Sequence, residues 1–262
     1  MFDKHTFHGD RTVGVVGGGT MGVGIAYVFA AAGWSTHVAE PDEARAVAMH
    51  ATWVHAAQSA VKRGKWSPEQ SQALLHRIHR VPSVDALPAS LNLVIESVPE
   101  KLELKQSVLK SIVAKTPSLI ATNTSSMSVD LLSQSVQDPS MFLGMHFFNP
   151  VWSLHLVELI RGHHTSDDSI QKAKAIASSL GKQTILVKDM PGFATSRLDL
   201  IASLEAMRMV QEGVASAQDI DLAATVAYRH PMGPLRLSDV VGLDVRLDIA
   251  QQLSQTLGER YE

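Results

Sequence analysis

The chain has 262 residues, of which 45% are hydrophobic and 19% are charged, so it is long enough for one large or two modest globular domains and is neither disordered nor fibrous. Its formal net charge of −3 provides no broad basic face for nucleic acid or an anionic membrane. The chain contains no cysteine, which excludes disulfides, thiol nucleophiles and cysteine-ligated metal sites. Its polar, acid-bearing start and its lack of long apolar runs predict a cytoplasmic protein without a targeting peptide or membrane span.

Strands and helices alternate through most of the sequence. A β-rich run over 12–16 ends on glycines, a helix over 21–32 follows, and a strand over 35–39 completes a βαβ unit. We expect helical structure from 42 to about 80, broken at 64–68. The remaining elements expected before Lys188 are strands over 91–95, 118–122, 141–148, 154–160 and 184–187, and helices over 102–113 and 167–180. This alternation predicts an α/β fold, a Rossmann-type domain with a mostly parallel sheet, over 1–188.

Strand signals stop after Lys188. A helix is expected to begin at Pro191 and to end at Gly213, with a turn at 230–234 before two further helical stretches. The sequence therefore predicts a second, all-helical domain over 189–262.

The loop after the first strand has the form of a dinucleotide-binding motif. Residues 17–22, GGGTMG, fit G-x-G-x-x-G, in which Gly17 permits the turn, Gly19 lets a pyrophosphate approach the backbone and Gly22 lets helix and sheet pack closely. Glu40 follows 23 residues after Gly17, at the end of the second predicted strand. A carboxylate there hydrogen-bonds the adenosine ribose and repels a 2′-phosphate, which favours NAD over NADP.

Two polar segments end predicted strands beside this motif, namely TNTSS at 122–126 and HFFNP at 146–150, and Glu158 follows His146 by 12 residues. Parallel sheets place their ligands at such strand ends. With these segments, the sequence resembles the L-3-hydroxyacyl-CoA dehydrogenase family, which includes the bacterial 3-hydroxybutyryl-CoA dehydrogenases. The resemblance covers nearly the whole chain, through VGVVGGGTMG, VIESVPE, ATNTSS, GMHFFNPV, LVELI, DMPGF, EGVAS and HPMGPLRLSDVVGLD.

The resemblance implies an NAD-dependent oxidoreductase of fatty acid metabolism that interconverts (3S)-3-hydroxyacyl-CoA and 3-ketoacyl-CoA. His146 matches the family's catalytic base, Glu158 its carboxylate partner, and Ser125 the serine that hydrogen-bonds the substrate oxygen. A histidine has a pKa suited to exchanging the hydroxyl proton near neutral pH. Ser196 stands where the family's PGF-x-x-NR segment has an asparagine that binds the substrate carbonyl, which puts that contact in question.

The resemblance also assigns binding residues and an oligomeric state. The residues expected at the cofactor are Gly17, Gly19, Thr20, Met21, Gly22, Glu40, Glu100 and Asn123. The residues expected at the acyl-CoA substrate are Ser125, Asn149, Lys62 and Arg63, the last two as contacts to CoA phosphate unless they are only a solvated helix end. The helical domain is expected to form a homodimer, no metal is expected, and a C-terminal tail is expected to be missing because the family continues beyond the point where this chain stops.

Two other functions remain open. A related dehydrogenase acting on a carrier-protein-bound or free 3-hydroxy acid would keep His146 and Glu158 but change the thioester contacts, with Ser196 and Trp152 as the places where a change would appear. A non-catalytic NAD-binding structural protein on the same fold is the other, and the presence of Ser125, His146 and Glu158 argues against it.

Overall fold

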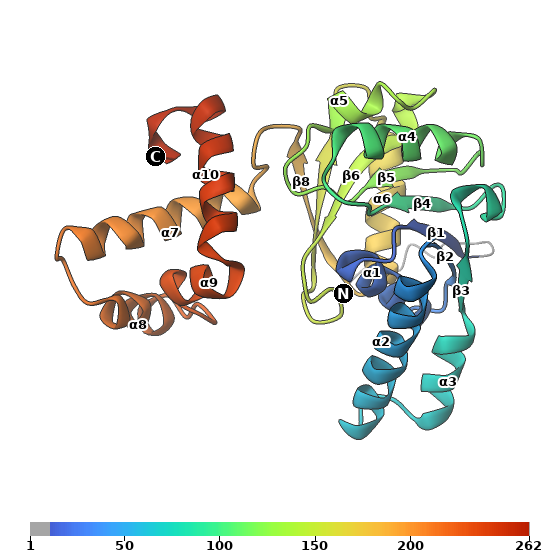
Figure 1. Ribbon diagram of the computed structural model, residues 1–262, viewed down its shortest axis with the longest axis horizontal. Coiled ribbons are helices and arrows are strands. Elements are labelled where there is room, and N and C mark those ends of the chain that lie inside the picture. The colour runs from blue at the N-terminus through green and yellow to red at the C-terminus, as the bar shows by residue number, and fades with distance from the viewer. Residues whose placement is uncertain (1–10, 262) are drawn as a thin grey trace. The chain divides into compact units, whose positions relative to one another are not determined.

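The computed structural model describes residues 11–261, which form two compact units (Figure 1). The first unit ends at Asp189 and the second begins at Met190. Within the described residues, no helix is both long enough and apolar enough to cross a membrane.

The first unit is built on one eight-stranded sheet with the order β3-β2-β1-β4-β5-β6-β7-β8. The strands are β1 Thr12–Val16, β2 Ser35–Ala39, β3 Ile78–Val81, β4 Leu93–Glu96, β5 Ile120–Thr122, β6 Phe142–Phe147, β7 Leu156–Arg161 and β8 Gln183–Lys188. All neighbouring strands are parallel except β6 and β7, which are antiparallel. The chain order reverses at β1, which has β2 on one side and β4 on the other, and ligands bind outside the carboxyl ends of the strands at such a switch point. The predicted α/β class with a mostly parallel sheet is confirmed.

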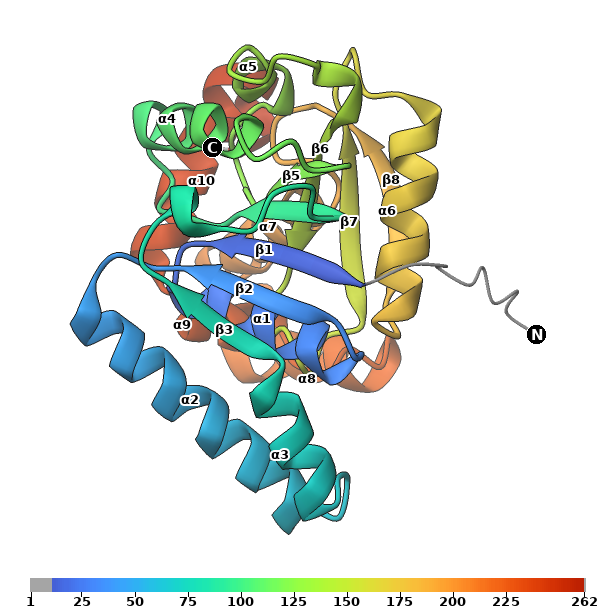
Figure 2. The same ribbon diagram turned by 90° about the vertical axis from the view of Figure 1, so that its right-hand side faces the viewer.

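Helices connect these strands. They are α1 Thr20–Ala31, α2 Glu43–Lys62, α3 Pro68–His76, α4 Leu102–Val113, α5 Val129–Ser133 and α6 Asp167–Ser179, with short 3₁₀ turns at Val84–Ala86 and Pro139–Met141. Figure 2 shows α2 and α3 side by side as a hairpin that projects beyond the β3 edge of the sheet. The hairpin helices are capped by Asp42 and Ser67, whose side chains accept hydrogen bonds from backbone N–H groups of the first turn.

The core explains why α1 has no polar face. Its residues from Gly22 to Ala30 are all buried, and those that carry apolar side chains belong to one cluster with residues of β1, β4, β6, α2 and α6. Trp34, just after α1, is fully buried and its indole N–H donates to Ser179 Oγ at 3.2 Å, which ties α1 to the end of α6. The cluster also includes buried residues of β2, β5 and β7, so it packs most of the sheet against these helices.

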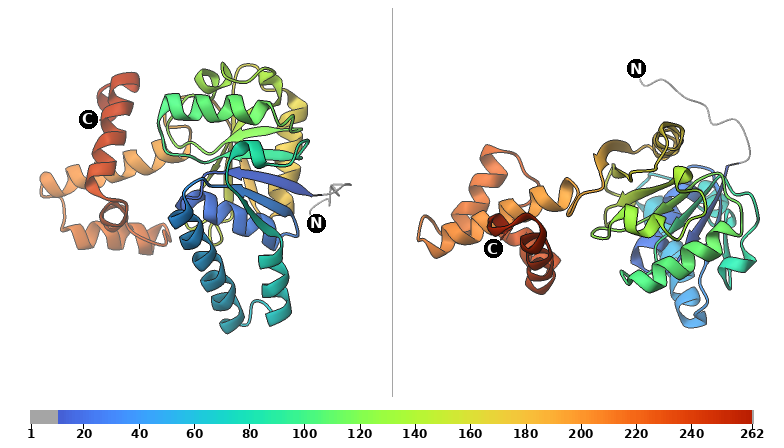
Figure 3. Two further views of the ribbon diagram at one scale, coloured as in Figure 1. Left: turned by 45° about the vertical axis from the view of Figure 1, so that its right-hand side comes forward. Right: turned by 90° about the horizontal axis from the view of Figure 1, so that it is seen from above.

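The second unit is entirely helical, as predicted for this part of the chain. It contains α7 Thr195–Gln211, α8 Ala217–Ala227, α9 Pro234–Val241, α10 Leu243–Leu257 and a 3₁₀ turn at Glu259–Tyr261, seen from two further directions in Figure 3. Leu200, Ala250, Leu253 and Tyr261 form its small core.

Two of the predicted elements are wrong. Helix was expected up to about Arg80, but α3 ends at His76 and Ile78–Val81 form β3, because pairing with β2 supplies an edge strand its hydrogen bonds. A helix was expected to begin at Pro191, but α7 begins at Thr195. Gly192 and Phe193 have φ values of +71° and +47°, which are left-handed and interrupt a helix.

Candidate active site

A cavity of about 1040 Å³ opens at the carboxyl ends of the central strands. It collects residues from the loops after β1, β2, β3, β4, β5 and β6, together with one face of α4. Among the residues predicted for the site, those that line it are Gly17, Gly19, Thr20, Met21, Glu40, Glu100, Asn123, Ser125, His146 and Asn149. The cavity therefore lies at the topological switch point of the sheet and is lined by most of the residues predicted for the site.

In the glycine loop at the entrance to α1, backbone atoms leave no room for a side chain at two positions, Gly17 and Gly22. A Cβ on Gly17, whose φ is +107°, would lie 2.7 Å from the backbone oxygen of Ser97. A Cβ on Gly22 would lie 1.9 Å from the backbone oxygen of Gly17, so Gly22 lets α1 cross close over the loop. Gly19 differs, because a Cβ there would meet no heavy atom within 4 Å. The open space beside Gly19, at the N-terminus of α1, fits a pyrophosphate that approaches the backbone closely.

Glu40 stands where the adenosine ribose of a dinucleotide is bound in this type of fold. It is 1% exposed, its Oε2 accepts from the N–H of Gly18 at 2.9 Å, and its Oε1 accepts from the N–H of Asp42 at 2.9 Å. The Arg45 Nη1 lies 3.4 Å from Oε2, and the Arg45 side chain is 53% exposed. These contacts fix the carboxylate at the cavity wall with a cation beside it. The glycine loop and Glu40 together fit an NAD molecule.

His146 and Glu158 form a hydrogen-bonded pair at the cavity. They occupy directly opposed positions in the antiparallel β6–β7 pair, and opposed residues share one face of a sheet. The His146 Nδ1 lies 3.1 Å from Glu158 Oε2, with Glu158 fully buried and His146 9% exposed. The 12-residue spacing in the sequence is thus the length of a hairpin. The antiparallel turn that produces it was not predicted.

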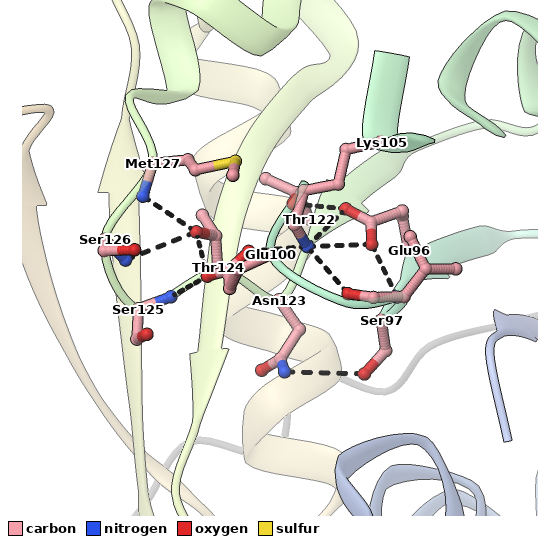
Figure 4. Close-up of polar contacts among 11 residues, drawn as sticks. Glu96, Ser97, Glu100, Lys105, Thr122, Asn123, Thr124, Ser125, Ser126 and Met127 are labelled. Carbon is pink, nitrogen blue, oxygen red and sulfur yellow. Dashed lines mark hydrogen bonds and ion pairs between the residues drawn. The ribbon is translucent and has the colours of Figure 1, made fainter. Parts of the chain in front are cut away.

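Ser125 lies on the loop after β5, and its backbone is hydrogen-bonded to Glu100 of the loop after β4. The Ser125 N–H donates to Glu100 Oε1 at 2.9 Å, and the Thr124 hydroxyl donates to the same oxygen at 2.6 Å (Figure 4). Asn123 accepts from the N–H of Phe147 at 2.9 Å through Oδ1. The loops after β4, β5 and β6 are therefore connected by side-chain hydrogen bonds at the cavity wall.

Two buried lysines near the site were not singled out from the sequence. Lys182 donates to the carbonyl oxygens of Val151 and Leu154 at 2.7 and 2.6 Å, which holds the loop that follows HFFNP, and burial lowers the pKa of its ammonium. Lys105 is fully buried between Glu96 and Glu100. Lysines are usually exposed, so only the tertiary structure reveals them.

Four residues predicted for the site lie in the first unit but do not line the cavity, namely Gly22, Glu158, Lys62 and Arg63. Lys62 ends α2 and Arg63 follows it, at the far end of the helical hairpin. Ser196 belongs to the second unit, where it is the second residue of α7. The catalytic and binding roles assigned to all of the predicted site residues stay predictions.

A doubly wound sheet with this glycine loop, buried acid and cavity defines a Rossmann-type dinucleotide-binding protein. Residues 12–190 match the family model for the 3-hydroxyacyl-CoA dehydrogenase NAD-binding domain, and residues 192–262 match the model for the C-terminal domain of that enzyme. The chain belongs to the 3-hydroxyacyl-CoA dehydrogenase family, whose members are NAD-dependent oxidoreductases.

Individual relatives support this assignment over most of the chain. A 3-hydroxybutyryl-CoA dehydrogenase of Mycobacterium tuberculosis is 38% identical over 255 residues, covering 96% of this chain and 89% of that protein. Another, from Bradyrhizobium diazoefficiens, is 37% identical over 251 residues, covering 95% of this chain and 85% of that protein. The crystal structure of (S)-3-hydroxybutyryl-CoA dehydrogenase from Ralstonia eutropha has a TM-score of 0.92 at 37% identity and covers 97% of this chain and 90% of that one.

Proposed function

We propose that this protein interconverts (3S)-3-hydroxyacyl-CoA and 3-ketoacyl-CoA, with His146 as the general acid and base. The observation that carries the proposal is the 3.1 Å contact between His146 Nδ1 and Glu158 Oε2 beside the cavity that fits NAD. Family membership supports the reaction class. The names of the relatives support a short substrate such as 3-hydroxybutyryl-CoA.

Glu158 selects the tautomer and the orientation of the His146 ring. A carboxylate on Nδ1 keeps the hydrogen on that nitrogen, so the lone pair of the neutral imidazole lies on Nε2. In the oxidation direction Nε2 takes the proton of the 3-hydroxyl, and the buried Glu158 stabilises the imidazolium that results. In the reduction direction the same nitrogen returns the proton to the oxygen of the ketone.

NAD supplies the acceptor for the hydride that leaves the substrate carbon. Gly17, Gly19 and the first turn of α1 would hold its pyrophosphate, and Glu40 would bind its ribose. Ser125 is placed at the cavity wall to hydrogen-bond the substrate oxygen, and a hydroxyl group there orients the reacting carbon relative to His146. Ser196 is expected to take the place of the family asparagine at the substrate carbonyl.

The substrate class is tested by a panel of 3-keto compounds, followed through NADH consumption. Acetoacetyl-CoA, longer 3-ketoacyl-CoA esters, acetoacetyl linked to acyl carrier protein, and free acetoacetate are compared at equal concentrations. The proposal predicts the highest kcat/KM for a CoA ester. A higher kcat/KM for the carrier-linked or free acid would replace it with the related dehydrogenase, and no turnover of any member would favour a non-catalytic NAD-binding protein.

A further inference from the structure

Lys105 is the most completely buried cation described near the active site. Its side chain is 0% exposed on the first turn of α4, and its ammonium lies 2.9 Å from Oε1 and 3.1 Å from Oε2 of Glu96, at the end of β4. A third hydrogen bond of 3.2 Å reaches the carbonyl oxygen of Val98. Removing a lysine from water costs free energy, so an ammonium is buried this completely only when its partners are fixed.

Two groups besides Lys105 donate hydrogen bonds to the Glu96 carboxylate. The Thr122 hydroxyl donates to Glu96 Oε2 at 2.6 Å, and the N–H of Val98 donates to Oε1 at 2.7 Å. Burial raises the pKa of the Glu96 carboxyl, while Lys105 and these hydrogen bonds lower it. Glu96 thus joins the end of β4 to α4 through Lys105 and to the end of β5 through Thr122.

The same ammonium has a second carboxylate partner, and that partner lines the cavity. Glu100 Oε2 lies 3.0 Å from the Lys105 ammonium, and the Glu100 side chain is 36% exposed. Its other oxygen accepts from the Thr124 hydroxyl and from the N–H of Ser125 (Figure 4). A continuous chain of charged contacts therefore runs from fully buried Glu96, through Lys105 and Glu100, to the backbone of Ser125.

We propose that Lys105 is a positioning residue that holds the Ser125 loop in its catalytic conformation by fixing Glu100; this rests on the role of Ser125 in the proposed function. A purely structural ion pair would need Glu96 alone, and an apolar pair of similar volume often serves stability equally well. The bridge to Glu100 adds nothing to the buried core but fixes a cavity-lining carboxylate in one orientation. That orientation in turn fixes the N–H of Ser125.

The test replaces the buried pair without leaving an unpaired charge in the core, since Glu100, which loses its cation, is 36% exposed. In the double variant Glu96→Gln/Lys105→Met, the glutamine amide can accept from Val98 N–H and donate to the Thr122 oxygen, while the bridge to Glu100 is lost. Glu96→Gln alone is the matched control, since it keeps the contact between Lys105 and Glu100. We expect the control to retain kcat within about twofold, and the double variant to lose on the order of 10-fold to 100-fold in kcat, since small misplacements of reacting groups have effects of this size.

A coupling measurement separates positioning from general damage. Ser125→Ala is introduced into the wild type and into the double variant, with NADH affinity measured by fluorescence titration in each. If Lys105 acts through Ser125, the substitution lowers kcat in the wild type and has a much smaller effect in the double variant, while NADH Kd changes less than about threefold. An equal loss in both backgrounds overturns the proposal for Lys105 but leaves the proposed function intact. No loss in the wild type removes the assumed role of Ser125 and overturns the proposal for Lys105 with it.

A second variant covers the case in which the double variant fails to fold. Glu100→Gln acts from the exposed end of the chain of contacts, where the folding risk is small. Its amide oxygen can still accept from Ser125, but its NH₂ group then faces the Lys105 ammonium and two donors oppose each other. We expect a loss of kcat and a reduced effect of Ser125→Ala. Full kcat with an undiminished Ser125→Ala effect would overturn the proposal.

Discussion

Cofactor selection is predicted to depend on Glu40 and Arg45 as a pair. Glu40 is buried and accepts from two backbone N–H groups, and Arg45 lies 3.4 Å from its Oε2 with a half-exposed side chain. The Glu40 carboxylate repels a 2′-phosphate and forms an ion pair with the Arg45 guanidinium. Removing the carboxylate in Glu40→Ser should therefore both end the repulsion and release Arg45 toward the phosphate.

The magnitudes follow from these charges. Two unit charges about 4 Å apart near a protein surface interact by about 4 kcal/mol, which corresponds to on the order of 10³-fold in Kd. We expect the wild type to prefer NADH over NADPH by roughly 10²-fold to 10³-fold, and Glu40→Ser to reduce the preference to roughly 10-fold. A charge-assisted contact contributes about 1.5 to 3 kcal/mol, so Glu40→Ser/Arg45→Met should bind NADPH roughly 10-fold to 150-fold more weakly than Glu40→Ser.

The assay is fluorescence titration of NADH and NADPH against the folded variants. Glu40→Gln is the matched control, because it removes the charge while keeping the volume and one acceptor for the N–H groups of Gly18 and Asp42. Arg45→Met in the wild-type background should leave NADH affinity within about threefold, since exposed ion pairs contribute only about 0 to 1 kcal/mol. An unchanged preference in Glu40→Ser would refute the reasoning, as would an equal loss of NADH and NADPH affinity on removal of Arg45.

Three further predictions concern other parts of the chain. Lys182→Met should lower the free energy of unfolding by about 2 kcal/mol, because two buried carbonyl oxygens lose their donor. Because the pKa of Lys182 is lowered in the native state, the native protein loses the Lys182 proton at a lower pH than the unfolded chain does. The free energy of unfolding of the wild type should therefore rise relative to that of Lys182→Met as pH increases toward 10.5. Urea unfolding at pH 8 and pH 10 measures both the loss of stability and its pH dependence. The helical unit is predicted to form a homodimer through apolar side chains that it leaves exposed, such as Leu198 at 70% and Leu222 at 57%, and a monomer in light scattering at micromolar concentration would contradict this. Ser196→Ala should lower kcat/KM on acyl-CoA by about fivefold through the loss of one hydrogen bond, and unchanged kinetics in both Ser196→Ala and Ser196→Asn would remove Ser196 from the site.

Local patterns carried most of the fold prediction. The βαβ unit could be predicted because a buried strand, a glycine turn, a helix and a second strand follow one another within 28 residues, from Thr12 to Ala39. Each of these elements is recognisable from its own residues, without knowledge of what packs against it. The predicted helix over 102–113 agrees with α4 in both bounds. β3 was missed because an edge strand of four residues, two of them polar, has no distinct periodicity, and only its pairing with β2 makes it a strand.

The candidate site was predictable where a motif places a functional group at a strand end. His146 and Glu158 could be proposed as partners from the resemblance, but their opposed register depends on β7 turning back antiparallel to β6, and no local signal specified that direction. Lys105 and Lys182 could not be found from the sequence, since a lysine among helical or polar neighbours is typical of a solvated surface. Lys182 is buried against carbonyl oxygens 31 and 28 residues away along the chain, and Lys105 is buried against nearby carboxylates only because α4 folds back over the end of β4.

The most direct test of the account compares His146→Gln with the wild type in acetoacetyl-CoA reduction and in NADH binding. General acid–base catalysis typically contributes about 10²-fold to 10⁴-fold, and His146 lies beside the cavity without belonging to the glycine loop or to the Glu40 contacts. We predict a loss of kcat within that range at an NADH Kd close to that of the wild type, with Glu158→Gln giving a loss in the same direction. A folded His146→Gln variant that reduces acetoacetyl-CoA at a rate near the wild-type value would contradict the central claim.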